Sequence, residues 1–139
     1  MLYQDSRAKL ASLLSPDELI EPDSPSYTAE STTWASQQNR HPAIVVRPKT
    51  VEALSRVLVY LNNTDLELDV RSQGYGNASS KDVLISTSAF DQVHIDEAER
   101  VVTLGAGQRW SNYYDKMQEI APDWTSMPPI HAPPIADIS

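Results

Sequence analysis

The chain has 139 residues, with 11 basic and 19 acidic side chains and a net charge of −8. This acidity argues against a nucleic-acid partner and against docking on an anionic membrane surface, because both depend on clustered Lys and Arg. The absence of cysteine excludes disulfides, thiolate nucleophiles and Cys-based metal sites, and no apolar run approaches the ~20 residues of a membrane-spanning helix.

Residues 1–42 are expected to form a helix followed by an irregular arm. The N-terminus has no basic segment followed by an apolar stretch, so no signal peptide is indicated and we expect a soluble, intracellular protein. Apolar residues at helical spacing predict a helix over 5–14. Residues 15–18 have the pattern of a capping box with Pro at the first helical position, which predicts a short second turn. The proline-punctuated remainder of the arm is predicted to be irregular, with one helical turn near Tyr27.

The middle of the chain has the pattern of a strand, a helix and two further strands. A short apolar run over 43–46 is typical of a buried strand. Apolar residues on one face predict a helix over 51–62. Alternation of apolar and polar residues predicts a half-buried strand over 68–71, parallel to the first. A third short apolar run predicts another buried strand over 83–86.

The last third of the chain has the pattern of a β-hairpin and a helix. Two short strands, 93–96 and 101–104, are separated by a four-residue turn. Aromatic and apolar residues at helical spacing then predict a helix over 110–120. The remaining residues are rich in proline and predict no regular structure. The expected fold is therefore α+β, with a small parallel sheet, flanking helices and part of an antiparallel layer.

The best candidate site is the loop that follows the strand over 68–71. Only 4 glycines occur in the chain, and they form two pairs, Gly74 with Gly76 and Gly105 with Gly107. The first pair and the small polar residues around it allow a sharp turn whose backbone N–H groups bind phosphate without basic side chains. The alternative is an ordinary tight loop. It is not a dinucleotide fingerprint, because no third glycine and no helix follow.

The histidines and the C-terminal aromatic residues have simpler interpretations. The three histidines are too scattered for a metal motif, and we expect His94 to be an exposed strand residue rather than a catalytic base. No pair of carboxylates and no Ser–His–Asp arrangement is indicated, so no catalytic residue is assigned. The aromatic residues are either a platform for a ligand or, as we expect, anchors of a hydrophobic core: Trp110, Tyr113 and Tyr114.

Five stretches carry the motifs of a known family in that family's order and spacing. They are residues 42–51, 68–75, 83–88, 93–96 and 101–110. Together they resemble the FAD-binding PCMH-type domain of the vanillyl-alcohol-oxidase and berberine-bridge-enzyme-like FAD-linked oxidases, and most of all the fungal members that make secondary metabolites. The resemblance runs from about Trp34 to Trp124, which is most of the chain.

The resemblance implies a set of cofactor-binding residues. In the family, backbone amides of the loop after the second strand wrap the FAD pyrophosphate, one further element lies near the flavin, and a third begins the next helix near the cofactor. These three roles fall respectively on Arg71, Ser72, Gln73, Gly74, Tyr75, Gly76 and Asn77, on Pro48, and on Gly105 and Gly107.

Two positions depart from the family pattern. Many members have a histidine in the loop that bonds covalently to the flavin, but Tyr75 occupies that position here. We therefore expect any FAD to be held non-covalently. A tyrosyl link is chemically conceivable, but stacking or loop packing is the expected task of Tyr75. The family often has an acid in the third strand, directly after the positions of Val83, Leu84 and Ile85, where this chain has Ser86.

The largest departure is length. The family continues with a second Gly-rich segment and a substrate domain, whereas here 43–124 is expected to be a partial FAD-binding domain and 125–139 a proline-rich irregular tail. The resemblance thus implies the FAD-binding portion of an oxidoreductase, truncated and not competent alone. Its family transfers a hydride from a small organic substrate to the flavin, which O₂ reoxidises. That substrate would bind only if the missing domain were supplied.

Two alternatives to this function stay open. One is a truncated, non-catalytic relative that acts as an interaction module, or a product without function; an exposed sheet edge would favour its self-association. The other is a soluble domain that binds a different phosphate ligand in the loop over 72–77.

Overall fold

The computed structural model describes residues 4–124, so the expected proline-rich tail, 125–139, lies outside the described residues. The fold class is α+β, as predicted. The elements in chain order are α1 (Gln4–Leu13), the 3₁₀ helix η1 (Pro16–Glu18), β1 (Leu19–Ile20), α2 (Tyr27–Ser31), the 3₁₀ helix η2 (Ser36–Gln38), β2 (Ile44–Val46), α3 (Val51–Leu61), β3 (Leu68–Arg71), β4 (Val83–Ser86), β5 (Val93–Asp96), β6 (Val101–Leu104) and α4 (Trp110–Ile120).

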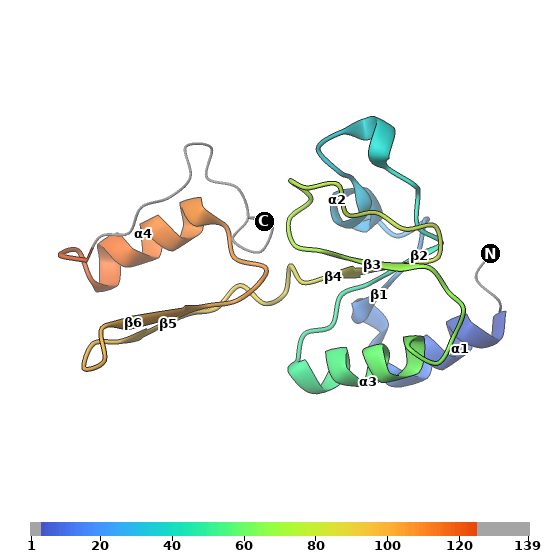
Figure 1. The fold of residues 1–139 in the computed structure, drawn as a ribbon, viewed down its shortest axis with the longest axis horizontal. Coiled ribbons are helices and arrows are strands. Elements are labelled where there is room, and N and C mark those ends of the chain that lie inside the picture. Colours follow the sequence, from blue (N-terminus) through green and yellow to red (C-terminus); the bar gives the residue numbers. More distant parts are fainter. Residues whose placement is uncertain (1–3, 125–139) are drawn as a thin grey trace.

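The main sheet has the strand order β1-β2-β4-β3. Strands β2 and β3 both run parallel to β4, so the predicted parallel arrangement is confirmed, with β4 inserted between the first two strands. Helices α1 and α3 cover one face of this sheet and α2 covers the other (Figure 1). The two central strands are buried on both faces, which explains why their sequences are continuous apolar runs rather than alternating ones.

The core of this sheet draws on the first 42 residues as well as on the strands. On the face of α1 and α3 the buried side chains are Leu10, Ile44, Val46, Val57, Leu61, Val83 and Ile85. On the face of α2 they are Ile20, Val45 and Leu84, with Tyr27 packed against them. The N-terminal helix and arm therefore complete both layers.

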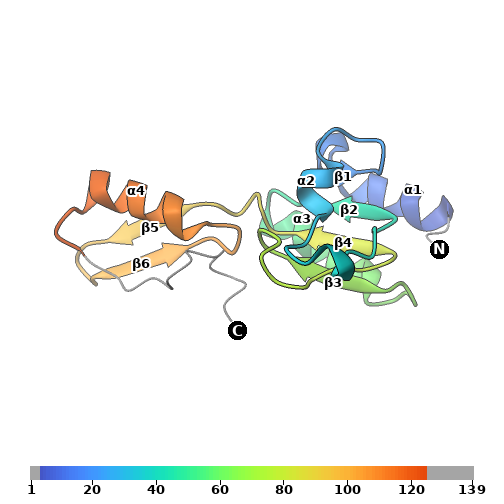
Figure 2. The same cartoon turned by 90° about the horizontal axis from the view of Figure 1, so that it is seen from above.

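A second, smaller layer is formed by the β5–β6 hairpin and α4, which lie beside the main sheet (Figure 2). The hairpin has the predicted register, with Asp96 opposite Val101 across the turn. Tyr113 and Met117 are buried against the hairpin, and Trp110 and Tyr114 pack around them. The aromatic residues are thus core anchors, as expected, and His94 is exposed, also as expected.

Two local predictions were wrong. Strand β1 was not anticipated; it pairs antiparallel with β2 and makes the sheet mixed rather than purely parallel. In β3 the expected burial is reversed, since Leu68 is 39% and Val70 47% exposed whereas Arg71 is only 5% exposed. The reason is that β3 is an edge strand: the core under α1 and α3 takes its buried strand residues from β2 and β4 alone, while Arg71 lies on the face covered by α2.

Glu18 joins the end of η1 to the start of the loop before α3. Its side chain is buried and accepts hydrogen bonds from the backbone N–H of Ser15 at 2.8 Å and of Lys49 at 2.7 Å. Burial acts to raise the pKa of Glu18, but these N–H donors outweigh burial and hold its pKa below the usual value.

We expect Glu18→Gln to lower the free energy of unfolding by about 2 kcal/mol at neutral pH, because a charged acceptor of two buried donors is lost. A carboxylate whose folded-state pKa is lowered stabilises the fold above its unfolded pKa, and this contribution is lost as the pH falls through the folded pKa. The difference between wild type and variant should therefore shrink from about pH 6 to about pH 3. Urea denaturation across this range measures it, with the exposed Glu119→Gln as the control. A difference that does not change with pH would contradict the argument.

Candidate functional site

The predicted loop lies where the parallel strands of the main sheet end. Strand β3 ends at Arg71, directly opposite Ser86 at the end of β4, and β2 ends beside Ile85 of β4. The carboxyl ends of parallel strands are the usual place for ligands in sheets that contain parallel strands. The loop over 72–77 therefore leaves the sheet at the expected edge.

Hydrogen bonds join this loop to the segment that precedes α4. Ser72 Oγ donates to the carbonyl oxygen of Ala106 at 2.6 Å, and Gln73 Nε2 donates to that of Gly107 at 2.6 Å. Arg109 Nε in turn donates to Gln73 Oε1 at 3.2 Å. The two glycine-containing segments singled out in the sequence are thus in direct contact, although 34 residues separate Ser72 from Ala106.

Three backbone N–H groups of the loop are available to a ligand. Among the described residues, the N–H groups of Gln73, Gly74 and Tyr75 donate to no protein acceptor. Gly74 has a φ of 77°, a conformation that L side chains rarely adopt and that lets successive N–H groups converge. Backbone N–H groups without protein acceptors in a turn of this kind can bind an anion such as phosphate without cationic side chains.

The glycines around the loop are also required by close packing. A Cβ atom on Gly74 would lie 2.6 Å from both Arg71 Nε and the carbonyl oxygen of Thr32. A Cβ atom on Gly107 would lie 2.8 Å from Ser88 Cα and closer still to the carbonyl oxygen of Thr87. Neither position therefore tolerates a side chain, with or without a cofactor.

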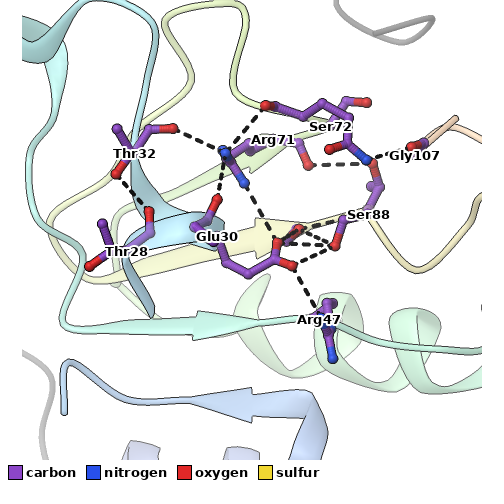
Figure 3. A network of polar contacts seen from close by, with 12 residues as sticks. Thr28, Glu30, Thr32, Arg47, Arg71, Ser72, Ser88 and Gly107 are labelled. Carbon is purple, nitrogen blue, oxygen red and sulfur yellow. Dashed lines mark hydrogen bonds and ion pairs between the residues drawn. The ribbon is translucent and has the colours of Figure 1, made fainter. Parts of the chain in front are cut away.

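The Arg71 side chain lies between the loop and the end of α2 (Figure 3). Its Nη2 donates to the carbonyl oxygens of Ala29 and Thr32, both at 3.0 Å, and to that of Gln73 at 3.3 Å. The guanidinium group thus connects the end of α2 to the first turn of the loop. Arg71 therefore fixes the start of the loop relative to α2.

The carboxylate that completes this site belongs to Glu30 of α2, which the sequence did not indicate. Ser86 Oγ donates to Glu30 Oε2 at 2.6 Å, and Ser88 Oγ donates to Glu30 Oε1 at 2.9 Å. Arg47 Nη1 lies 3.2 Å and Arg71 Nη1 3.5 Å from this carboxylate. The only signal in the sequence was indirect: Ser86 stands where the family often has an acid.

The remaining predicted residues lie around the loop without a common contact. Tyr75 is 40% exposed, and its ring centroid lies 5.5 Å from that of Trp34, which is 77% exposed. The Trp34 N–H donates to the carbonyl oxygen of Gly74 at 2.8 Å and so holds the aromatic pair beside the turn. Asn77 is exposed, and Pro48 is buried two residues beyond β2, at the same end of the sheet.

Comparison with known proteins identifies the family. Residues 42–129 match the sequence model of a family described as the FAD binding domain. The chain belongs to this family. The resemblance to PCMH-type FAD-binding domains is thereby confirmed.

The curated relatives of this FAD-binding domain include fungal FAD-dependent monooxygenases. One from Penicillium roqueforti is 31% identical over 106 residues, which cover 71% of this chain and 21% of the relative. Another from Arthrobotrys oligospora is 28% identical over 99 residues, covering 66% of this chain and 19% of the relative. The chain thus spans about a fifth of the length of the curated relatives it matches.

Solved structures show the same fold as this FAD-binding domain. The wild-type Phl p 4.0202, a glucose dehydrogenase, superposes with a TM-score of 0.72 at 17% identity, over 86% of this chain and 27% of that one. The 6-hydroxy-D-nicotine oxidase of Arthrobacter nicotinovorans gives a TM-score of 0.67 at 21% identity, over 77% of this chain and 24% of that one. Within residues 4–124, no helix is long and apolar enough to cross a membrane, and no group of acidic or histidine side chains could hold a metal ion.

Proposed function

We propose that this chain is the FAD-binding portion of an FAD-linked oxidoreductase and that its loop over 72–77 binds the FAD pyrophosphate. Membership of the FAD binding domain family supports FAD as the cofactor. The observation that carries the position of the site is the set of three N–H donors at Gln73, Gly74 and Tyr75, which lack protein acceptors within the described chain. Arg109, exposed and bonded to Gln73, adds a positive charge beside these donors.

The reaction we propose is hydride transfer from a small organic substrate, with the flavin as acceptor and O₂ as the final oxidant. The residues described here would bind and orient the cofactor through its phosphates. The substrate site and the groups that move protons would come from parts of the relatives that this chain does not cover. We therefore expect cofactor binding, but no turnover, from the 139 residues by themselves.

We expect the complex with FAD to be non-covalent, because Tyr75 stands where the family's flavin-linked histidine would be and the loop contains no histidine. The Tyr75 ring already packs against Trp34, which fits the stacking or packing task expected for it. We expect acid denaturation of a reconstituted complex to release all of the flavin. Flavin that stays with the protein, detected as an added mass, would instead indicate attachment at Tyr75.

Ligand titration followed by NMR tests the proposed site. We expect FAD and ADP, which share a pyrophosphate, to bind, and riboflavin, which has no phosphate, to bind far more weakly. A ligand at about 100 times its Kd should raise the free energy of unfolding by about 2.7 kcal/mol. The largest amide shifts should occur at residues 73–75, with the hairpin turn over 97–100 as the internal control. Shifts confined to another region would show that the loop is misassigned, and the absence of binding would refute the function.

Self-association through a sheet edge stays a prediction. Strands β1 and β3 are the edges of the main sheet. On β3, Asp69 Oδ1 accepts the N–H of Val70 at 2.8 Å, and Asp69 Oδ2 accepts that of Ser79 at 2.9 Å. A charged side chain that occupies an edge donor works against pairing with a second strand. Sedimentation velocity on the full chain measures the outcome.

A further inference from the structure

The Glu30 side chain contacts residues from three different segments beside the loop over 72–77. It lies in α2, outside the residues that match the family, and its carboxylate is buried. Figure 3 shows Arg47, Arg71 and Ser88 directed at this carboxylate. Arg71 is the last residue of β3, Arg47 directly follows β2, and Ser88 lies two residues after β4. One side chain therefore holds the ends of the three parallel strands.

Glu30 accepts hydrogen bonds in this cluster, and it also supplies a negative charge beside the buried guanidinium of Arg71. Arg71 is buried, and a buried guanidinium requires a counter-charge to offset the loss of its hydration. The serine hydroxyls near it carry no charge. Glu30 supplies such a counter-charge, with its carboxylate 3.5 Å from Arg71 Nη1.

The connection from Glu30 to the loop passes through Arg71. While Arg71 Nη1 faces the carboxylate of Glu30, its Nη2 donates to the carbonyl oxygen of Gln73, the first of the three residues with N–H groups available to a ligand. The same Nη2 contacts the carbonyl oxygen of Thr32, two residues before Trp34, whose N–H holds Gly74. Both series of contacts, the one through Gln73 and the one through Thr32 and Trp34, lead to the turn at Gly74.

We propose that Glu30 is a positioning residue that fixes the conformation of the loop over 73–75, acting through Arg71. This inference rests on the proposed FAD site for its functional consequence, but the effect on the loop is independent of FAD. Glu30 itself is not expected to touch the cofactor.

The test compares Glu30→Gln, which keeps the shape and removes the charge, with Glu30→Gln/Ser86→Asp, which returns a carboxylate to the same place from β4. Hydrogen exchange of the full chain without ligand reports on the loop, and FAD titration reports on binding. We expect Glu30→Gln to speed exchange at 73–75 and to weaken FAD binding, each by about tenfold or more, and Ser86→Asp to restore most of both. Exchange in the β5–β6 hairpin should not change.

Two controls separate charge from packing. Ser88→Ala removes a neutral donor to Glu30, and Glu21→Gln removes the charge of a surface pair with Arg7; each should change exchange at 73–75 by less than about threefold. If Glu30→Gln does not fold, Glu30→Asp in place of it should give an intermediate acceleration. Unchanged exchange in a folded Glu30→Gln, an equal effect of Ser88→Ala, or no restoration by Ser86→Asp would each overturn the proposal. Wild-type protein that fails to bind FAD would refute the proposed function and leave the exchange result to decide the role of Glu30.

Discussion

Replacing Arg71 by methionine is expected to lower the free energy of unfolding by about 3–5 kcal/mol, the usual cost of removing one partner from a buried ion pair. The side chains of Arg71 and Glu30 are only 6% and 11% exposed. In the variant, water therefore cannot solvate the carboxylate of Glu30, which is left without this partner. The variant also leaves the carbonyl oxygens of Ala29 and Thr32 without their donor. Urea denaturation monitored by circular dichroism measures the loss.

The matched control for this variant is Arg40→Met. Arg40 forms an ion pair with Glu67, but these side chains are 41% and 38% exposed. Exposed pairs contribute little because water screens them, so this substitution should cost less than about 1 kcal/mol. Equal losses in the two variants would show that the Arg71 cluster is not a buried ion-pair network.

Gly107→Ala is expected to cost about 3 kcal/mol of unfolding free energy, because the added methyl group meets backbone rather than a flexible side chain. The atoms in its way belong to Thr87 and Ser88, in the segment that leads from the main sheet to the hairpin. The Gly107 N–H, which donates to the carbonyl oxygen of Phe90 at 2.8 Å, would move with it. Thermal unfolding without any ligand measures this effect.

The neighbouring Ala106→Ser is the control, since the side chain at this position is exposed and only its carbonyl oxygen takes part in the junction. We expect a change within about 0.5 kcal/mol. The comparison also separates two explanations for the glycine. If Gly107 served the cofactor alone, Gly107→Ala would leave the ligand-free protein as stable as the wild type.

The location of the candidate site was predictable from local sequence, but its internal contacts were not. Short apolar runs and the strand–helix–strand order were enough to place the loop after β3 at the carboxyl ends of parallel strands. The hydrogen bond between Ser86 and Glu30 spans 56 residues. No periodicity or spacing in a single sequence specifies such a pair, and the arm that carries Glu30 has the composition of an irregular segment.

By itself, the sequence determined those features that depend on neighbours in the chain: the helices, the hairpin with its four-residue turn, the glycine pairs and the family resemblance. Only the tertiary structure decided which face of β3 is buried, that β1 extends the sheet, and that the Arg71 side chain connects α2 to the loop. The reason is physical. Hydrophobic periodicity and turn chemistry act over a few residues, whereas burial of a charge is favourable only when distant segments supply its partners. The burial of Arg71 depends on α2, which supplies the carboxylate of Glu30 and the carbonyl oxygen of Ala29 that contact its guanidinium group.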